Sequence, residues 1–185
     1  MTTKRVIVSG FGGQGVMGIG QLLTYAGMFD DKNVSWLPSY GPEMRGGKAN
    51  CSVILSDDPI GAPNIAQADA VIAMNEPSLD KFESYVVPDG HIFINSSLVN
   101  KDTTRGDINS HLLPVNGLTE KFGNPRVLNM IMIGAFNEIT GMVSQGALEK
   151  AVDKLYGKKG EKVMKSNLEA LKFGGEKMKE IVNAK

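Results

Sequence analysis

Apolar residues near the start of the chain change from a strand spacing to a helix spacing across a cluster of glycines. A β-branched run, Val6–Val8, is followed by four glycines within Gly10–Gly15. Apolar residues then recur at the spacing of one helix face, at Val16, Ile19, Leu23 and Ala26. The pattern predicts a strand, a glycine turn and a helix.

The next hundred residues alternate between strand and helix patterns. Strands are predicted at Asn33–Leu37, Ala49–Ser56, Ala70–Met74, Ile92–Ile94 and Leu112–Val115. The Ala49–Ser56 segment alternates apolar and polar residues before an Asp-Asp-Pro turn, so we expect an antiparallel hairpin arm beside a parallel sheet. A helix is predicted from Pro77 until Pro88–Gly90 ends it.

The segment Val127–Ile139 is apolar on nearly every side, which indicates a helix packed deeply or against a partner subunit. We expect a surface that stays partly exposed in the isolated chain and is buried in a complex, made by Ile131, Met132, Ile133, Ala135 and Phe136.

From Gly146 onward the chain is helical in pattern and rich in lysine, with apolar spacing interrupted at Gly174–Gly175. Its polar side is either a solvated face or a docking surface for an acidic subunit. We therefore predict one three-layer, Rossmann-like α/β domain over residues 1–185, with a mostly parallel sheet and one antiparallel hairpin. Residues 1–145 would form the core and 146–185 the C-terminal helices.

The glycine turn is the first candidate site. Its residues are Gly10, Gly12, Gly13, Gln14 and Gly15. Glycines leave backbone N–H groups uncovered at a helix N-terminus, where the helix dipole favours phosphate or carboxylate. The turn therefore predicts anion binding.

Two other interpretations of this turn stay open. Gly10, Gly12 and Gly15 match the dinucleotide fingerprint, which also needs an acidic residue at the end of the second strand. Asp30 and Asp31 have the right spacing but precede that strand, so the ribose anchor is missing. The turn would otherwise serve only to pack the helix on the strand.

The second candidate site is the loop Pro38–Gly47, which has little regular pattern for its length. Its candidate ligand-binding residues are Ser39, Tyr40, Glu43, Arg45, Gly46 and Gly47. Arg45 is the strongest candidate because a guanidinium can grip a phosphate bidentately, and Lys48 is a weaker second. We expect the first two strands to be adjacent and parallel, which would place both loops at the same edge of the sheet. An irregular crossover held by prolines is the alternative.

Charge and residue counts exclude several classes of function. The 20 basic residues equal the 20 acidic ones, so no overall field indicates nucleic acid. The single cysteine, Cys51, is expected to be buried. His91 and His111 lack the neighbours of a catalytic triad or metal site, so we expect structural roles and no metal. No apolar stretch is long enough to span a membrane and no signal peptide is evident, so we expect a cytoplasmic protein without a membrane partner.

Together the two glycine-rich segments resemble the gamma subunit of 2-oxoacid:ferredoxin oxidoreductases. The resemblance is carried, in order, by Gly-Phe-Gly-Gly-Gln-Gly-Val (10–16), Pro-Ser-Tyr-Gly-Pro-Glu-Met-Arg-Gly-Gly (38–47), Ala-Asn-Cys-Ser-Val (49–53), Ala-Asp-Ala-Val-Ile-Ala-Met-Asn (68–75), Pro77-Ser78-Leu79 and Asn129-Met130. The loop at 38–47 is its specific part, and it resembles 2-oxoglutarate or branched-chain members more than pyruvate members.

The resemblance implies one part of a complex that decarboxylates a 2-oxoacid, passes electrons to ferredoxin and forms acyl-coenzyme A. Thiamine diphosphate and Mg²⁺ would lie between alpha and beta subunits, and iron–sulfur clusters in beta or in a small ferredoxin-like delta subunit. One cysteine agrees with this division, since a cluster needs four thiolates. This chain would be inactive alone, cover the active site and help bind coenzyme A. An independent dinucleotide-dependent oxidoreductase and a purely structural assembly subunit remain as alternatives.

Overall fold

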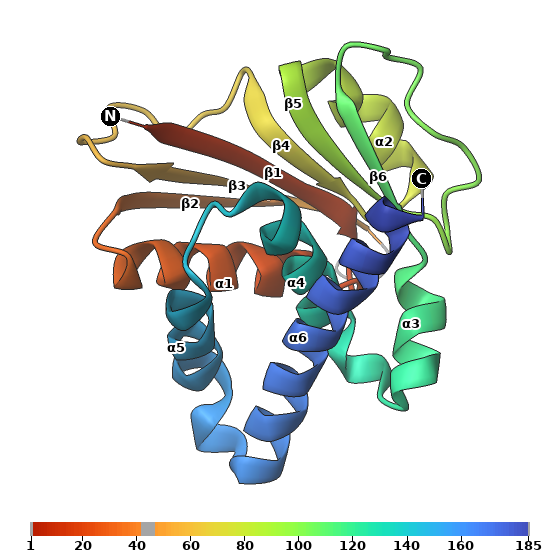
Figure 1. The fold of residues 1–185 in the computed structure, drawn as a ribbon. Coiled ribbons are helices and arrows are strands. Elements are labelled where there is room, and N and C mark those ends of the chain that lie inside the picture. Colours follow the sequence, from red (N-terminus) through yellow and green to blue (C-terminus); the bar gives the residue numbers. More distant parts are fainter. Residues whose placement is uncertain (1, 42–46, 185) are drawn as a thin grey trace.

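The computed structural model describes residues 2–41 and 47–184, which form a six-stranded sheet between two layers of helices (Figure 1). The strand order is β2-β3-β1-β4-β5-β6. The strands are β1 (Thr3–Phe11), β2 (Asn33–Tyr40), β3 (Lys48–Ser56), β4 (Ala68–Ala73), β5 (Val86–Asn95) and β6 (Asn109–Leu113).

The sheet is parallel from β1 through β4 and β5 to β6, while β3 is antiparallel to both β1 and β2. The expectation that the first two strands are adjacent is wrong, because β3 folds back between them. Since β3 runs opposite to each, β1 and β2 still run in the same direction. Their carboxyl ends therefore meet at one edge of the sheet.

Both faces of the sheet are covered. One face carries α1 (Val16–Phe29), α3 (Val115–Phe122), α4 (Leu128–Thr140), α5 (Gln145–Tyr156) and α6 (Glu161–Asn183), and the other carries α2 (Glu76–Phe82) (Figure 1). Alternate residues of β1 serve the two cores: Val6 and Val8 face the first layer, and Ile7 faces the second. Strands buried on both faces explain the continuous apolar runs of the sequence.

Helix α4 is core. Ile131, Met132, Ile133, Ala135 and Phe136 have no exposed surface in the isolated chain, so the prediction that they stay partly exposed is wrong. The helix lies between the sheet and α6, and the Phe136 ring lies 5.1 Å from that of Phe93 on β5. The chain's own C-terminal helix covers the surface that we assigned to a partner.

Helix α6 runs unbroken through Gly174 and Gly175, where the apolar spacing of the sequence is interrupted. These glycines lie where α6 crosses α4, and a β-carbon at Gly174 would lie 2.1 Å from the Ile131 carbonyl oxygen. The missing side chains therefore let the two helices approach closely.

Several predicted boundaries differ from the structure. The strand predicted to end at Leu37 continues through Pro38 to Tyr40, so the first residues assigned to the Pro38–Gly47 loop belong to β2. The helix predicted to end at Pro88–Gly90 ends at Phe82; a 3₁₀ turn, Glu83–Tyr85, follows, and β5 begins at Val86. Asp89 instead adopts a positive φ of 62° and donates its N–H to Asp107 O over 2.8 Å, within the strand. The predicted Leu112–Val115 strand ends at Leu113, and α3 starts at Val115.

Candidate functional site

The glycine turn joins β1 to α1 at the carboxyl edge of the sheet. Gly13 and Gly15 adopt positive φ angles of 97° and 76°, which favour glycine. A β-carbon at Gly10 would lie 2.8 Å from that of Met74, at the end of β4. The glycines therefore set both the turn and its close packing.

The Gln14 side chain holds this turn to the neighbouring strand. Its Oε1 accepts the Phe11 N–H (2.6 Å) and the Asn75 amide (3.2 Å), while its Nε2 donates to Met74 O (3.3 Å). Gln14 was predicted to be a ligand-binding residue, and in the structure its side-chain amide makes these positioning contacts.

The first turn of α1 presents backbone donors. Among the described residues, Val16, Met17 and Gly18 find no acceptor for their N–H groups, and the helix has no side-chain N-cap. Unpaired N–H groups and the positive end of the helix dipole together favour an anion at this position.

The two candidate loops meet directly. The Gly12 N–H donates to Gly47 O over 3.0 Å, and the Gly41 N–H donates to Lys48 O over 2.7 Å. Ser39 and Tyr40 end β2 and are exposed, with 69% of Tyr40 accessible. Glu43, Arg45 and Gly46 lie outside the described residues. The structure therefore brings Gly47 to the glycine turn and leaves the Tyr40 ring open to solvent.

A small cleft beside Gly10 was not predicted from the sequence. It has a volume of about 80 Å³ and lies between the ends of β1 and β3 and helix α2, with Lys48 and Lys81 on its rim. The Ser9 hydroxyl donates to the Ser78 hydroxyl over 2.9 Å at its wall. Asn75 caps α2 by accepting the Ser78 N–H, so the Asn-x-x-Ser pattern was the available signal. The cleft adds two cations to the same edge of the sheet.

Other candidate groups lie away from this edge or are buried. Cys51 has no exposed surface, as predicted, and burial raises the pKa of its thiol to about 11. His91 Nδ1 and His111 Nε2 lie 3.1 Å apart on β5 and β6. The described ranges contain no group of three or more His, Cys, Asp or Glu residues placed to hold a metal ion. No helix within them is both long enough and apolar enough to cross a bilayer.

A covered α/β sheet with a glycine turn after its first strand defines the class of Rossmann-like domains. Within that class the chain belongs to the pyruvate ferredoxin/flavodoxin oxidoreductase family, whose model matches residues 5–177. This confirms the family that the two glycine-rich segments indicated.

Several relatives are oxidoreductase subunits. The chain is 34% identical over 174 residues to the ketoisovalerate oxidoreductase subunit VorA of Methanothermobacter thermautotrophicus, covering 93% of this chain and 36% of that protein. It is 32% identical over 152 residues to the 2-oxoglutarate synthase subunit KorC of Methanocaldococcus jannaschii, covering 80% and 81%. The chain thus spans about a third of the first relative and most of the second.

Solved structures confirm the predicted α/β fold. The gamma subunit of a keto/oxoacid ferredoxin oxidoreductase from Geobacter sulfurreducens superimposes with a TM-score of 0.80 at 30% identity, covering 96% of this chain and 99% of that one. A 2-oxoglutarate:ferredoxin oxidoreductase from Magnetococcus marinus, with 2-oxoglutarate, coenzyme A and succinyl-CoA bound, gives a TM-score of 0.89 at 22% identity. The match covers 97% of this chain and 32% of that one.

Proposed function

We propose that this chain is the gamma-type subunit of a cytoplasmic complex that oxidatively decarboxylates a 2-oxoacid to acyl-coenzyme A with ferredoxin as electron acceptor. It covers the active site, helps bind coenzyme A and is inactive alone. Thiamine diphosphate, Mg²⁺ and iron–sulfur clusters belong to alpha, beta and delta partner subunits. The single cysteine supports this division, because a cluster needs four thiolate ligands.

The observation that carries the coenzyme A assignment is the hydrogen bond from Gly12 to Gly47. It joins Gly47, the last residue of that loop, to the glycine turn before α1, where the N–H groups of Val16, Met17 and Gly18 have no acceptor among the described residues. Lys48 and Lys81 lie at the same edge. Coenzyme A carries a diphosphate, and phosphate is the anion that such helix ends and lysines favour.

The preferred substrate is 2-oxoglutarate or a branched-chain 2-oxoacid rather than pyruvate. The form of the Pro38–Gly47 loop supports this preference. So do the relatives, since the ketoisovalerate and 2-oxoglutarate subunits are 34% and 32% identical to this chain and a pyruvate synthase subunit PorC is 29% identical.

Two observations weigh against an independent dinucleotide-dependent oxidoreductase. Asp30 lies at the far end of α1, where its carboxylate accepts the N–H and hydroxyl of Ser144, each over 2.6 Å. The parallel strand beside β1 is β4, which is followed directly by Met74 and Asn75, while the next residue, Glu76, begins α2 and forms an ion pair with Lys101. The acidic ribose anchor of a nicotinamide site is missing at both positions.

The assignment as a subunit is tested by isolating the complex through an affinity tag on this chain. We expect two larger subunits to copurify and the complex to reduce a viologen dye with a 2-oxoacid and coenzyme A. The purified chain alone should give no turnover. Turnover by the chain without partners would contradict the proposal.

The coenzyme A assignment is tested by Arg45→Ala in the assembled complex. Losing one charge-assisted phosphate contact should raise KM for coenzyme A by roughly 10- to 100-fold, and Lys48→Ala should raise it less. Thiamine adduct formation with the 2-oxoacid should be unchanged. Arg5→Ala, an exposed arginine near the other end of β1, is the matched control. An unchanged KM, or loss of assembly, would identify the loop as a structural interface instead.

A further inference from the structure

The side of the sheet opposite α1 is left open at strands β2 and β3. On the α1 side, Val34 and Trp36 of β2 pack in the first core. Neighbouring residues of a strand point to opposite faces, so Ser35, Leu37 and Ser39 point away from α1. Their partners on β3 are Ile54, Ser52 and Asn50.

The second core does not extend over this part of the sheet. It reaches Ile54 of β3 and includes no described residue of β2. The side chains left uncovered are half-buried or exposed, and they form the open face: Ser35, Leu37, Ser39, Asn50 and Ser52. At its centre Leu37 is 40% exposed.

Strand β2 is also an edge of the sheet (Figure 1). An edge strand has unpaired backbone groups, which proteins protect with charged side chains, bulges or prolines. Strand β2 has Pro38, but none of its eight residues is charged, and its register with β3 contains no bulge. An uncharged edge beside an uncharged open face has the composition of a subunit interface, where charged residues are depleted.

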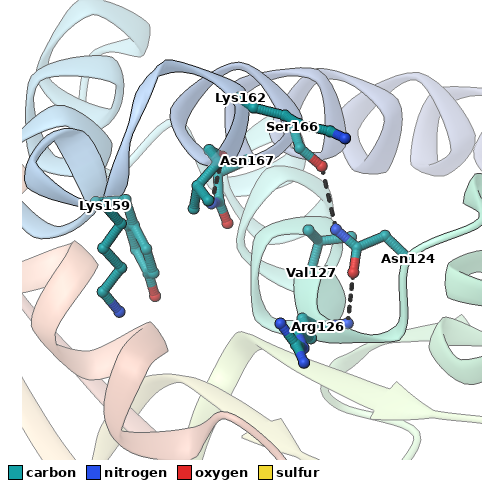
Figure 2. Close-up of a pocket in the computed structure, with 9 residues that line it drawn as sticks. Asn124, Arg126, Val127, Lys159, Lys162, Ser166 and Asn167 are labelled. Carbon is teal, nitrogen blue, oxygen red and sulfur yellow. Dashed lines mark hydrogen bonds between the residues drawn. The ribbon is translucent and has the colours of Figure 1, made fainter.

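The polar side of α6 is the other surface that the sequence offered for docking. Lysines of α6 form ion pairs with glutamates three or four residues later on the same helix. The pocket at the start of α6 has a volume of about 510 Å³ and is lined by Arg126, Lys159 and Lys162 (Figure 2). This charged surface is suited to water, so the open face is the better candidate for a permanent interface.

The open face continues to the edge of the sheet where coenzyme A is proposed to bind. Asn50 lines the cleft beside Gly10, together with Lys48 and Lys81. Ser39 lies at the same end of β2, one residue before the exposed Tyr40 ring. A subunit lying on the open face therefore reaches the coenzyme, as a subunit that forms the acyl group must.

The lengths of the relatives indicate what covers the open face. The subunit VorA matches 93% of this chain with only 36% of its own length, whereas the subunit KorC matches with 81%. The same domain thus occurs joined to a much longer chain in one relative and nearly alone in another. Covalent joining keeps two parts at high effective concentration, which favours contact between them.

We propose that the open face and the free edge of β2 are the docking surface for a separate subunit that corresponds to the part of VorA outside this domain. The inference rests on the proposed function and names where its partner binds. The contacting surface of that partner is uncharged, because a charge placed against Leu37 would be buried without a counter-ion.

Reassembly of the complex tests the surface. Leu37→Asp puts a charge in the middle of the open face, so titrating this variant into the separated partner subunits should require roughly 100-fold more chain for half-maximal activity. Leu98→Asp is the matched control, because Leu98 is 46% exposed in the turn after β5, and it should reassemble like the wild type. Urea unfolding should show that both variants are folded. At saturating Leu37→Asp chain, KM for coenzyme A should be unchanged.

Hydrogen exchange gives a readout on the unaltered protein. The N–H groups of β2 that point away from β3 have no partner strand among the described residues. Amides of residues 33–40 should therefore exchange about 10-fold or more slowly in the complex than in the isolated chain. Unchanged exchange over β2 in the assembled complex would overturn the proposal.

The outcomes separate this inference from the proposed function. If the tagged wild-type chain recruits no partner subunit, the proposed function fails and the docking surface with it. If the complex forms and Leu37→Asp reassembles like Leu98→Asp, only the docking surface is wrong. If the purified chain is a dimer in sedimentation and Leu37→Asp makes it monomeric, the open face binds a second copy of this chain, which also overturns the proposal.

Discussion

Gly174 of α6 contacts the backbone of Ile131 in α4 so closely that a β-carbon at position 174 would lie 2.1 Å from the Ile131 carbonyl oxygen. Gly134 of α4 shows the same relationship with Leu171 of α6, at 2.0 Å. In both cases the added β-carbon would clash with backbone atoms, and no side-chain rotamer moves a β-carbon. The position of α6 over the core therefore depends on these two residues.

We expect Gly174→Ala to destabilise the chain by about 1–3 kcal/mol, because the added methyl must push the two helices apart. The matched control is Gly146→Ala in α5, where an added β-carbon meets nothing within 4 Å. It should be neutral or stabilising by up to about 1 kcal/mol. Urea unfolding followed by circular dichroism measures both changes. Equal stability of the two variants would contradict close packing at the helix crossing.

Amide exchange in α4 should be slow in the isolated chain. Residues 131–136 have side chains without exposed surface, under α6 and against the sheet, so their amides should open only with global unfolding. Hydrogen exchange detected by mass spectrometry is the measurement, with α2 as an internal comparison. Fast exchange that slows only when partner subunits are added would restore the interface interpretation of this helix.

Local patterns predicted much of the fold. The glycine turn, the β-branched first strand and the helix face of α1 depend on contiguous residues, and each appears close to where the spacing placed it. The burial of α4 was not predictable in this way. A helix that is apolar on all sides must be covered, but its pattern does not say whether the cover comes from α6 or from another subunit.

The same limit applies to the site. The anion-binding turn and the Pro38–Gly47 loop are contiguous segments that the sequence singles out. The cleft by Gly10, by contrast, joins Lys48 to Lys81 across more than thirty residues of sequence. Lysines on amphipathic helices resemble an ordinary solvated face until the fold shows which of them surround one cavity.

Cys51 should resist thiol reagents while the chain is folded. Burial against α1 raises the pKa of its thiol to about 11, so almost no thiolate exists at neutral pH, and the side chain has no accessible surface. We expect labelling by iodoacetamide at pH 8 to be negligible in buffer and complete in denaturant. Rapid labelling of the native chain would mean that β3 and α1 separate readily.

Because of His91, the free energy of unfolding should fall as pH drops below about 6.5, the usual pKa of histidine. Burial, helped by the positive charge of Lys4, lowers the pKa of His91 in the folded chain. A lowered pKa means that the folded state holds the proton less tightly than the unfolded state, so protonation favours unfolding. The stabilising contribution of the neutral His91 ring is present above pH 6.5 and is lost as pH falls toward the lower, folded-state pKa.

His91 lies 3.1 Å from His111, with the rings stacked, so a charge on His91 also disturbs this contact. We expect His91→Gln to flatten the slope of unfolding free energy between pH 8 and pH 5.5, measured by urea unfolding at each pH. An unchanged slope in this variant would assign the pH dependence to other groups.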